Sequence, residues 1–545
     1  MPEAVWQQPA SATSTSRVIE WLAWATGVVS ILVSLAIIER APMPWLDEVY
    51  LVSVSNSVAQ GSDRAARLVP PPEWVDGYEK TYGPVFFHTE AAAIRLFGLS
   101  PFSGRITGWA GSVLLAFSSA WLILIVGGSS EMAAIAFALV TLTPEFSVIA
   151  RNGRMDTMAI GFELAGVACL LAALGRAQRT IPWGLLAGGC WAMAVLTTPR
   201  TLPFLCGLLV AAPILLKDGE TRASFVRAIL CLYAVVLAGL YLWSHHLGIT
   251  IIEWFFWLWN CVKDDSYNLA LPGHQRFWEL RIINAATPVA VVLAGAGIAI
   301  FARRIHPRLA GVIALGVASR RRLRFWYLVV ATSFNAVFYV VVTNYVFGMS
   351  QYFVLPMLIV MLMATSVLRR AQPRLGRPMF IFWLVVALAF GGIRALKYVE
   401  VWQTWRVRDP KLMQQFVEQW VPKGSIVFGD DQYYFYAVEG AGSVYRTFNL
   451  LNSGLDRLKN AEPRRQTVLP QVANSFLLWP VGDPSVLFPP WFDCARDHVV
   501  ARFEANTKPI GIERMAPFAF SPYLHGYPTT TLYRVPPGCP MTGSP

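Results

Sequence analysis

The stretch WLAWATGVVSILVSLAIIERAPMPWLDEVYLV, residues 21–52, joins a long apolar segment to a pair of adjacent carboxylates. Its first part, residues 21–38, is long and apolar enough to cross a lipid bilayer as a helix. It follows a polar tail and lacks a small-residue cleavage pattern at its end, so we expect an uncleaved membrane anchor. Asp47 and Glu48 therefore stand near the membrane surface, where the chain has just left the bilayer.

The composition of the whole chain agrees with a membrane protein. Of its 545 residues, 55% are hydrophobic and 14% are charged, whereas about 25% of the residues in an ordinary soluble domain are charged. The apolar residues form long blocks, which predicts a polytopic α-helical membrane protein. The net charge is +12, with basic residues at the ends of apolar blocks, where they meet anionic lipids. No basic face typical of nucleic-acid binding is evident, so we expect membrane lipids as partners and no nucleic acid.

The apolar blocks predict about eleven transmembrane helices. The arginine-rich connections at 303–324 and 369–377 fall on the same side as the N-terminus, which the positive-inside rule places in the cytoplasm. We therefore predict an integral protein of the cytoplasmic (inner) membrane, whose loops 39–104 and 245–284 and C-terminal region face outward. The predicted spans are residues 21–38, 105–126, 132–149, 156–174, 183–198, 201–216, 225–244, 285–302, 325–343, 352–368 and 379–396.

The chain divides into two predicted domains. Residues 1–398 form the transmembrane domain, and residues 399–545 form a small extracytoplasmic α/β domain. In the second domain, GSIVFGDDQYYFYAV (424–438) predicts a buried strand, an acidic turn and then an aromatic helix or strand. Cys494 and Cys539 could pair as a disulfide if this domain lies outside. Aromatic-rich amphipathic runs in the outer loops predict interfacial helices over the bundle.

Charged residues gather in the predicted outer connections. Asp47 and Glu48 follow Pro44, so they either cap a helix, because acids favour helix N-termini, or act as reagents at the membrane surface. In ARNGRMD (150–156), Arg151, Arg154 and Asp156 stand on the side where topology does not require arginine. Arg154 and Asp156 are either a structural ion pair or, with Arg151, part of an anion site. Arg200, in TTPRT, is a further basic residue at this edge.

The segment YEKTYGPVFFH, residues 78–88, offers a second set of candidates. Lys80 is either a snorkelling lysine beside the surface acid Glu79 or a clamp for a phosphate. In the functional interpretation, Glu79 or His88 ligates a metal. His274, in the second outer loop, is a further candidate metal ligand, although the histidines and aspartates around it have no fixed metal-ligand spacing. The sequence leaves a divalent metal cofactor open.

The ordered set of these motifs, over about residues 20–370, resembles the integral-membrane glycosyltransferases of the C type (GT-C). The most similar branches are the protein O-mannosyltransferases and the bacterial lipid A aminoarabinose transferase. The resemblance implies that Asp47 is the catalytic base, supported by Glu48. It also implies that Glu79 contributes to a metal site, that Lys80 meets a lipid phosphate, and that Asp156 is the second-loop acid, a further catalytic residue, with Arg154 beside it. One departure is MSQYFVLPML, where relatives often have Arg-Tyr and this chain has Gln351-Tyr352.

The expected activity is transfer of a sugar from a polyprenyl-phosphate donor to a hydroxyl of a glycan, lipid or protein acceptor of the cell envelope. Basic side chains would stabilise the charge that develops on the leaving phosphate, while Asp47 removes the acceptor's proton and the anomeric centre inverts. The alternative is a transporter or flippase of a lipid-linked or anionic substrate. Carriers place ionisable residues near the bilayer midplane and often have repeated halves, and neither feature is visible here. The candidates for the phosphate site are Lys80, Arg151, Arg154 and Arg200.

Overall fold

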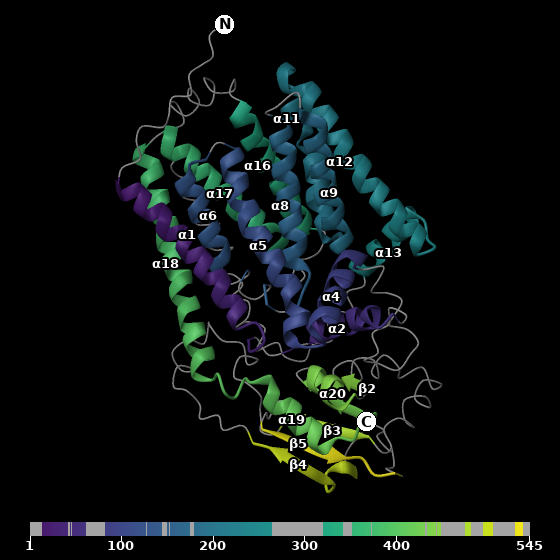
Figure 1. Cartoon of the computed structure of the whole chain (residues 1–545). Helices are drawn as coiled ribbons and strands as arrows, with labels where there is room; N and C mark the ends of the chain where they lie inside the picture. Colours follow the sequence, from purple (N-terminus) through teal and green to yellow (C-terminus); the bar gives the residue numbers. More distant parts are fainter. Residues whose placement is uncertain are drawn as a thin grey trace.

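The structure is a computed structural model of a helical bundle with a small α/β domain at one end (Figure 1). The residues that it describes are 14–41, 44, 46–61, 82–126, 128–143, 146, 150–151, 153–174, 179–263, 320–341, 351–371, 373–430, 433–442, 444–447, 475–480, 494–504 and 529–537. The bundle and its connections contain α1 (Ser14–Ala36), α2 (Leu46–Ala59), α4 (Pro84–Phe97), α5 (Pro101–Ile125), α6 (Ser130–Leu142), α8 (Asp156–Ala173), α9 (Thr180–Thr197), η2 (Pro199–Thr201), α10 (Leu202–Val210), α11 (Ala212–Leu216), α12 (Gly219–His246), α13 (Ile251–Lys263), α16 (Arg320–Val341), α17 (Gln351–Ala371) and α18 (Pro373–Gln403).

Seven helical segments of the described chain are long and apolar enough to cross a membrane. Shorter apolar helices at Ser130–Leu142 and Tyr352–Ser366 accompany them, and α16 matches the predicted span at 325–343. The predicted span at 285–302 lies outside the described residues. The prediction of a polytopic helical membrane protein is confirmed. The seven segments are Arg17–Ala36, Pro101–Ile125, Asp156–Ala173, Thr180–Thr197, Pro199–Leu216, Thr221–His246 and Gly376–Gln403.

Several predicted span ends differ from the structure by a few residues, and two of the differences change a helix end appreciably. The helix expected at 132–149 ends at Leu142, because Thr143 precedes a proline and adopts an extended conformation with ψ 148°; a residue before proline disfavours the α region. The last helix, expected at 379–396, continues to Gln403. The expected domain boundary at 398–399 therefore falls inside α18.

Helix α8 is central in the bundle, and nearly all of its residues are buried. It packs closely on α5, where a Cβ added at Gly111 would lie 2.5 Å from the backbone of Met158. Only glycine permits this approach without a shift of the backbone. Together with the hydrogen bond from the Thr157 hydroxyl to the backbone oxygen of Gly108, this close contact fixes the position of Asp156, the first residue of α8, relative to α5.

The C-terminal domain contains α19 (Pro410–Trp420), α20 (Tyr434–Ala441) and a five-stranded sheet of order β2-β1-β3-β5-β4. Strand β1 runs parallel to β2 and β3, whereas β5 is antiparallel to β3 and β4. The segment predicted as a strand followed by an acidic turn forms β1 and then α20. Cys494 is disulfide-bonded, and its partner lies outside the described residues. The strands are β1 (Ile426–Gly429), β2 (Val444–Thr447), β3 (Phe476–Pro480), β4 (Val499–Phe503) and β5 (Thr530–Arg534).

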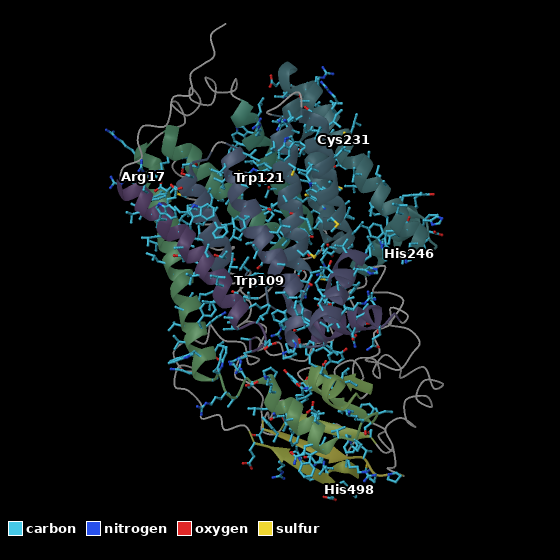
Figure 2. All side chains as sticks on the ribbon, in the orientation of Figure 1. Arg17, Trp109, Trp121, Cys231, His246 and His498 are labelled. Atoms are coloured by element: carbon cyan, nitrogen blue, oxygen red, sulfur yellow. The ribbon has the colours of Figure 1, made fainter. Side chains whose placement is uncertain are left out.

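Helices α2 and α4 lie across the end of the bundle, between it and the C-terminal domain (Figure 1). Arg17, at the start of α1, lies at the opposite end, away from His498 of the C-terminal domain (Figure 2). Phe86 and Phe87 of α4 share one buried cluster with Phe416 of α19 and Phe435 of α20. The C-terminal domain is therefore joined to the membrane domain by a common apolar core.

We predict that Phe435→Ala loosens the contact between the two domains. Phe435 is 1% exposed and faces Gly104 at the start of α5, and removal of a buried phenyl ring costs about 3–5 kcal/mol. Thermal unfolding in detergent and limited proteolysis of the connection between α18 and α19 provide the measurements. Leu412→Ala on α19, where the side chain is 42% exposed, is the control and should behave as wild type. The same unfolding midpoint and the same rate of proteolysis in both variants would contradict the shared core.

Candidate functional site

Three connections of the bundle meet near the start of α4. Helix α4 lies at the end of the bundle that faces the C-terminal domain (Figure 1). Asp156 begins α8, Arg200 lies in η2 between α9 and α10, and Tyr352 lies in the first turn of α17. Tyr82 immediately precedes α4. These residues are far apart in the sequence, and the bundle brings them into contact.

The carboxylate of Asp156 is the centre of this site and is completely buried. Its Oδ2 accepts a hydrogen bond from Nε of Arg154 at 2.6 Å, and its Oδ1 accepts one from the hydroxyl of Tyr352 at 2.7 Å. Nη1 of Arg200 lies 3.6 Å from Oδ1. A buried carboxylate is stable only when it is paired and hydrogen-bonded, and here both oxygens are engaged. One negative charge thus holds two guanidinium groups in fixed positions.

Arg200 connects this carboxylate to Tyr82, just before α4. Its Nη2 donates to the hydroxyl of Tyr82 at 3.2 Å, and its Cζ lies 5.4 Å from the centre of the Tyr82 ring. The hydroxyl of Tyr339, on α16, donates to the backbone oxygen of Arg200. The rings of Tyr339 and Tyr352 stack at 6.2 Å. The guanidinium is therefore oriented by Tyr82, which precedes α4, and by Asp156 of α8, while Tyr339 of α16 holds the backbone at Arg200.

Several of these partners were not identified as site residues from the sequence. Tyr82 lies inside the motif that supplied Glu79 and Lys80, and Tyr352 stood out only because an arginine is replaced by Gln351 beside it. Tyr339 gave no signal, because a tyrosine within an apolar run is typical of a buried helix face.

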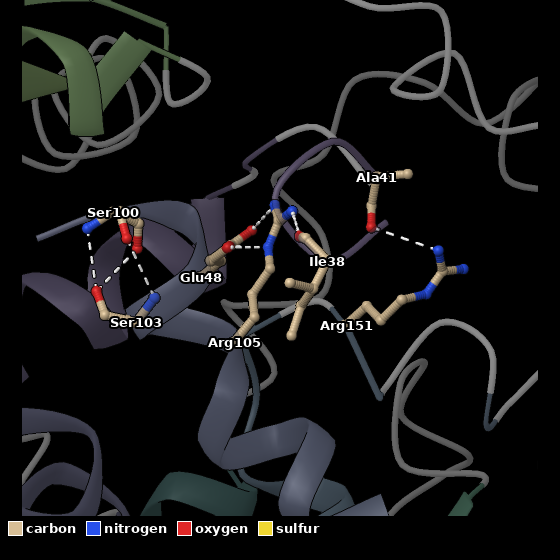
Figure 3. Close-up of polar contacts among 7 residues, drawn as sticks. All are labelled: Ile38, Ala41, Glu48, Ser100, Ser103, Arg105 and Arg151. Carbon is tan, nitrogen blue, oxygen red and sulfur yellow. Dashed lines mark hydrogen bonds and ion pairs between the residues drawn. The ribbon is translucent and has the colours of Figure 1, made fainter. Parts of the chain in front are cut away.

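Glu48 lies beside the site and is bound in a buried ion pair (Figure 3). Nε of Arg105 donates to Oε1 of Glu48 at 2.5 Å, Nη2 donates to Oε2 at 2.9 Å, and Nη1 donates to the backbone oxygen of Ile38 at 2.7 Å. Gly153 approaches so closely that an added Cβ would lie 2.5 Å from Cγ of Glu48. This ion pair ties the end of α1 to the starts of α2 and α5, and so fixes the backbone at Asp47. The side chain of Asp47 lies outside the described residues.

Arg151 is close to Arg154 in the chain but has different neighbours. It is buried, and its Nη1 donates to the backbone oxygen of Ala41 at 3.4 Å. Burial lowers the pKa of Arg151, and the nearby Arg394, Arg105 and Arg408 guanidiniums lower it further. The predicted phosphate group of Arg151, Arg154 and Arg200 is thus divided: Arg154 and Arg200 meet at Asp156, whereas Arg151 faces α18.

The candidate metal ligands and Lys80 are only partly described. Glu79, Lys80 and His274 lie outside the described residues, and His88 is exposed on α4. In the part of the chain that is described, no three histidine, cysteine, aspartate or glutamate side chains form a group that could hold a metal ion. The metal site remains a prediction.

A second buried acid, Glu90 of α4, lies between α2 and the C-terminal domain. Its Oε2 accepts a hydrogen bond from the Ser55 hydroxyl at 2.5 Å, while its Oε1 has no hydrogen-bond partner among the described residues. Burial raises the pKa of Glu90 well above its ordinary value; the Ser55 hydrogen bond opposes this shift and the charge of Glu48 adds to it. The neutral acid is the form that fits this environment.

Known structures show which fold this chain has. No protein-family model matches the chain, and no curated protein matches it. The crystal structure of ArnT from Cupriavidus metallidurans in the apo state is 12% identical, covering 98% of this chain and 100% of that chain with a TM-score of 0.52. The structure of the same protein bound to undecaprenyl phosphate gives a TM-score of 0.53 at the same identity and coverage. An oligosaccharyltransferase from Archaeoglobus fulgidus, 13% identical over 85% of this chain and 68% of that chain, has a TM-score of 0.46, too low to carry an argument.

The chain therefore has the GT-C fold of integral-membrane glycosyltransferases, as the sequence resemblance implied. The similarity extends over nearly the whole length of both chains, so it includes the C-terminal domain as well as the bundle. At this level of identity it establishes the architecture, and the chemistry has to be argued from the residues of the site.

We predict that Glu90→Gln stabilises the protein at neutral pH. A raised carboxyl pKa means that the folded protein binds a proton more tightly than the unfolded chain, so this contribution to stability is complete below the ordinary pKa of 4.5 and is lost as the pH rises through the folded pKa. Glutamine keeps the shape of the neutral acid and removes this loss. In thermal unfolding from pH 4 to 8, the midpoint of the variant should rise relative to that of wild type as the pH increases. A difference in midpoint that does not change with pH would contradict the raised pKa of Glu90.

Proposed function

We propose that the protein transfers a glycosyl group from a polyprenyl-phosphate donor to an acceptor hydroxyl at the outer face of the membrane. The observation that carries the proposal is the pair of guanidiniums, Arg154 and Arg200, held on the single buried carboxylate of Asp156. Among the described residues, the cluster has two positive charges and one negative charge, and this excess suits an anionic ligand. The shared fold with ArnT, which was crystallised with undecaprenyl phosphate, supports a lipid phosphate as that ligand.

The position of the cluster suits a donor that is partly lipid and partly water-soluble. Asp156 begins a membrane-spanning helix, and Arg200 lies at the start of another span. A polyprenyl chain would remain in the bilayer while its phosphate reaches this level. Guanidinium groups bind phosphate through charge-assisted hydrogen bonds in a fixed fork geometry. Lys80, two residues before Tyr82 in the same motif, is proposed to add a further charge to the phosphate.

Asp47 is proposed as the general base. Its carboxylate takes the proton of the acceptor hydroxyl while the hydroxyl oxygen attacks the anomeric carbon of the sugar. The bond between that carbon and the phosphate oxygen breaks, and its electron pair leaves with the phosphate, whose added charge Arg154, Arg200 and Lys80 stabilise. Attack opposite the leaving phosphate inverts the anomeric centre. General-base catalysis of this kind contributes on the order of 10²–10⁴-fold to the rate.

Two of the acids predicted as catalytic are proposed to act as positioning residues. Glu48 orders the first turn of α2 through Arg105 and thereby places Asp47. Both oxygens of Asp156 already accept hydrogen bonds. Asp156 is therefore proposed to orient Arg154 and Arg200 toward the phosphate. Neither is then required to exchange a proton during transfer.

The site is proposed to face outward from the cytoplasmic membrane. The arginine-rich start of α16 and the arginines in the connection from α17 to α18 lie at the other end of the bundle from the C-terminal domain (Figure 1), as expected for the cytoplasmic side. The disulfide at Cys494 agrees with an oxidising compartment for the C-terminal domain.

One observation favours a transporter as the second candidate. Glu163 on α8 is 1% exposed, and neither of its carboxylate oxygens has a hydrogen-bond partner among the described residues. Ionisable groups within a membrane span often lie on a transport path. Reconstitution in liposomes separates the candidates, because a carrier moves a lipid-linked sugar between leaflets without forming a glycosylated product.

We predict that Asp47→Asn lowers the rate of transfer by about 10²-fold or more and leaves binding of undecaprenyl phosphate intact. The amide retains the size of the side chain and cannot take the acceptor's proton. The measurement is product formation by purified protein with cell-envelope acceptors, together with donor-lipid binding on the same sample. Turnover at the wild-type rate would remove Asp47 from the mechanism.

We predict that Arg200→Gln weakens binding of undecaprenyl phosphate by about tenfold to a hundredfold, because one charge-assisted hydrogen bond contributes about 1.5–3 kcal/mol. Arg227→Gln, which removes an exposed arginine of α12, is the matched control. Binding is followed by the quenching of tryptophan fluorescence or by native mass spectrometry. Equal affinities of the two variants would show that the lipid phosphate lies elsewhere.

A further inference from the structure

A second group of basic side chains lies at the corner where α1 and α18 approach the outer surface. Arg394 of α18 is 3% exposed. Its Nε donates to the hydroxyl of Tyr398 at 2.7 Å, and its Nη2 donates to the hydroxyl of Ser34, on α1, at 2.9 Å. Its Nη1 is buried and has no hydrogen-bond partner among the described residues. The guanidinium is therefore held by neutral groups, with one N–H edge left over.

Two of the described groups near Arg394 carry the same positive charge as its guanidinium. Arg151 and Lys397 are its electrostatic neighbours, and Lys397 is half-buried one turn further along α18. The nearby acid Glu400 already accepts from Nη2 of Arg408 at 3.3 Å. Across the described part of the chain, neither Arg394 nor Lys397 has a carboxylate within ion-pair distance. The other basic residues of this corner have their own acids: Arg105 has Glu48, Arg408 has Glu400 and Arg40 has Asp409.

This arrangement is costly for the protein alone. Moving a guanidinium out of water is unfavourable unless a counter-ion accompanies it, and like charges nearby increase the cost. Ionisable residues at such positions in membrane proteins are usually paired or functional. A ligand anion would remove the cost and occupy the free edge of Arg394.

The surroundings indicate what carries the anion. The cluster is bordered by apolar side chains that α1 and α18 expose, as they would to lipid chains. An anion attached to acyl chains could therefore approach with its chains along these helices and its head at the level of Arg394. The exposed side chains are Val29, Leu32, Ile393, Leu396, Val399 and Trp402.

We propose that Arg394 and Lys397 bind the phosphate of an outer-leaflet membrane lipid, at a site separate from the Asp156 cluster. Among the described residues, the groups that act on the Arg200 guanidinium are Tyr82, Arg154, Asp156 and Tyr352, and none of these four is a described hydrogen-bond partner of Arg394. The bound lipid would fix the corner of α1 and α18.

The test uses the full-length protein, purified in detergent and stripped of lipid. The added probes are phosphatidylglycerol, diacylglycerol with the same acyl chains, and inorganic phosphate. Bound lipid is counted by native mass spectrometry, and stability is followed by the midpoint of thermal unfolding. The expected result is binding and a raised midpoint with phosphatidylglycerol alone, since only this probe combines a phosphate with acyl chains.

The variants are Arg394→Gln and, as the control on the same helix, Arg377→Gln, which removes an exposed arginine near the opposite end of α18. Arg394→Gln should weaken phosphatidylglycerol binding by about tenfold, and Arg377→Gln should not. Binding of undecaprenyl phosphate should be unchanged in Arg394→Gln, which separates this site from the donor site. If Arg394→Gln does not fold, Lys397→Gln replaces it, with the same expected loss.

Three results would overturn the proposal. Equal effects of phosphatidylglycerol and diacylglycerol would show that the phosphate is not recognised. An equal shift with inorganic phosphate would make this a free-phosphate site rather than a lipid site. Wild-type affinity for phosphatidylglycerol in both Arg394→Gln and Lys397→Gln would show that the cluster binds no lipid head.

Discussion

The buried carboxylate of Asp156 is the interaction on which the outer end of the bundle depends. A charge that is completely removed from water has to be neutralised and hydrogen-bonded, and the partners that do this come from the loop before α8, from η2 and from α17. Satisfying one acid thus fixes the positions of three connections. The same contacts orient two guanidiniums near the start of α4, where the hydroxyl of Tyr82 accepts a hydrogen bond from Arg200. The requirement for stability and the requirement for an anion site are met by the same atoms.

Charge at this end of the molecule is organised in two ways. Glu48 with Arg105 and Glu400 with Arg408 are balanced pairs that join helix ends. The Asp156 cluster and the corner around Arg394 each hold more positive than negative charge among their described residues. A protein whose substrate is carried by a lipid phosphate benefits from both arrangements, because balanced pairs hold the scaffold rigid while the unbalanced groups attract phosphates at the membrane surface.

The sequence predicted the membrane class and most spans, because a bilayer demands long apolar helices whatever the tertiary structure. It also identified Arg154 with Asp156 as a pair, since the two are close in the chain. It could not place Arg200 on the same carboxylate, or predict that Tyr339 and Tyr352 support the group, because these contacts depend on how distant helices pack. Arg105 and Arg394 were missed for a related reason: each lies at or within a predicted span, where a single arginine does not reveal its partner. Asp47, Glu79, Lys80 and His274 remain predictions.

The central claim is that the cluster on Asp156 receives the phosphate of a lipid-linked donor. The most direct measurement is a cryo-electron microscopy structure of the protein in a lipid nanodisc with bound undecaprenyl phosphate. We expect the phosphate within hydrogen-bonding distance of Arg154 and Arg200, near the start of α4, with the polyprenyl chain leaving between helices toward the bilayer. A phosphate bound at the arginine-rich end of the bundle, or near Glu163 in the middle of α8, would contradict it.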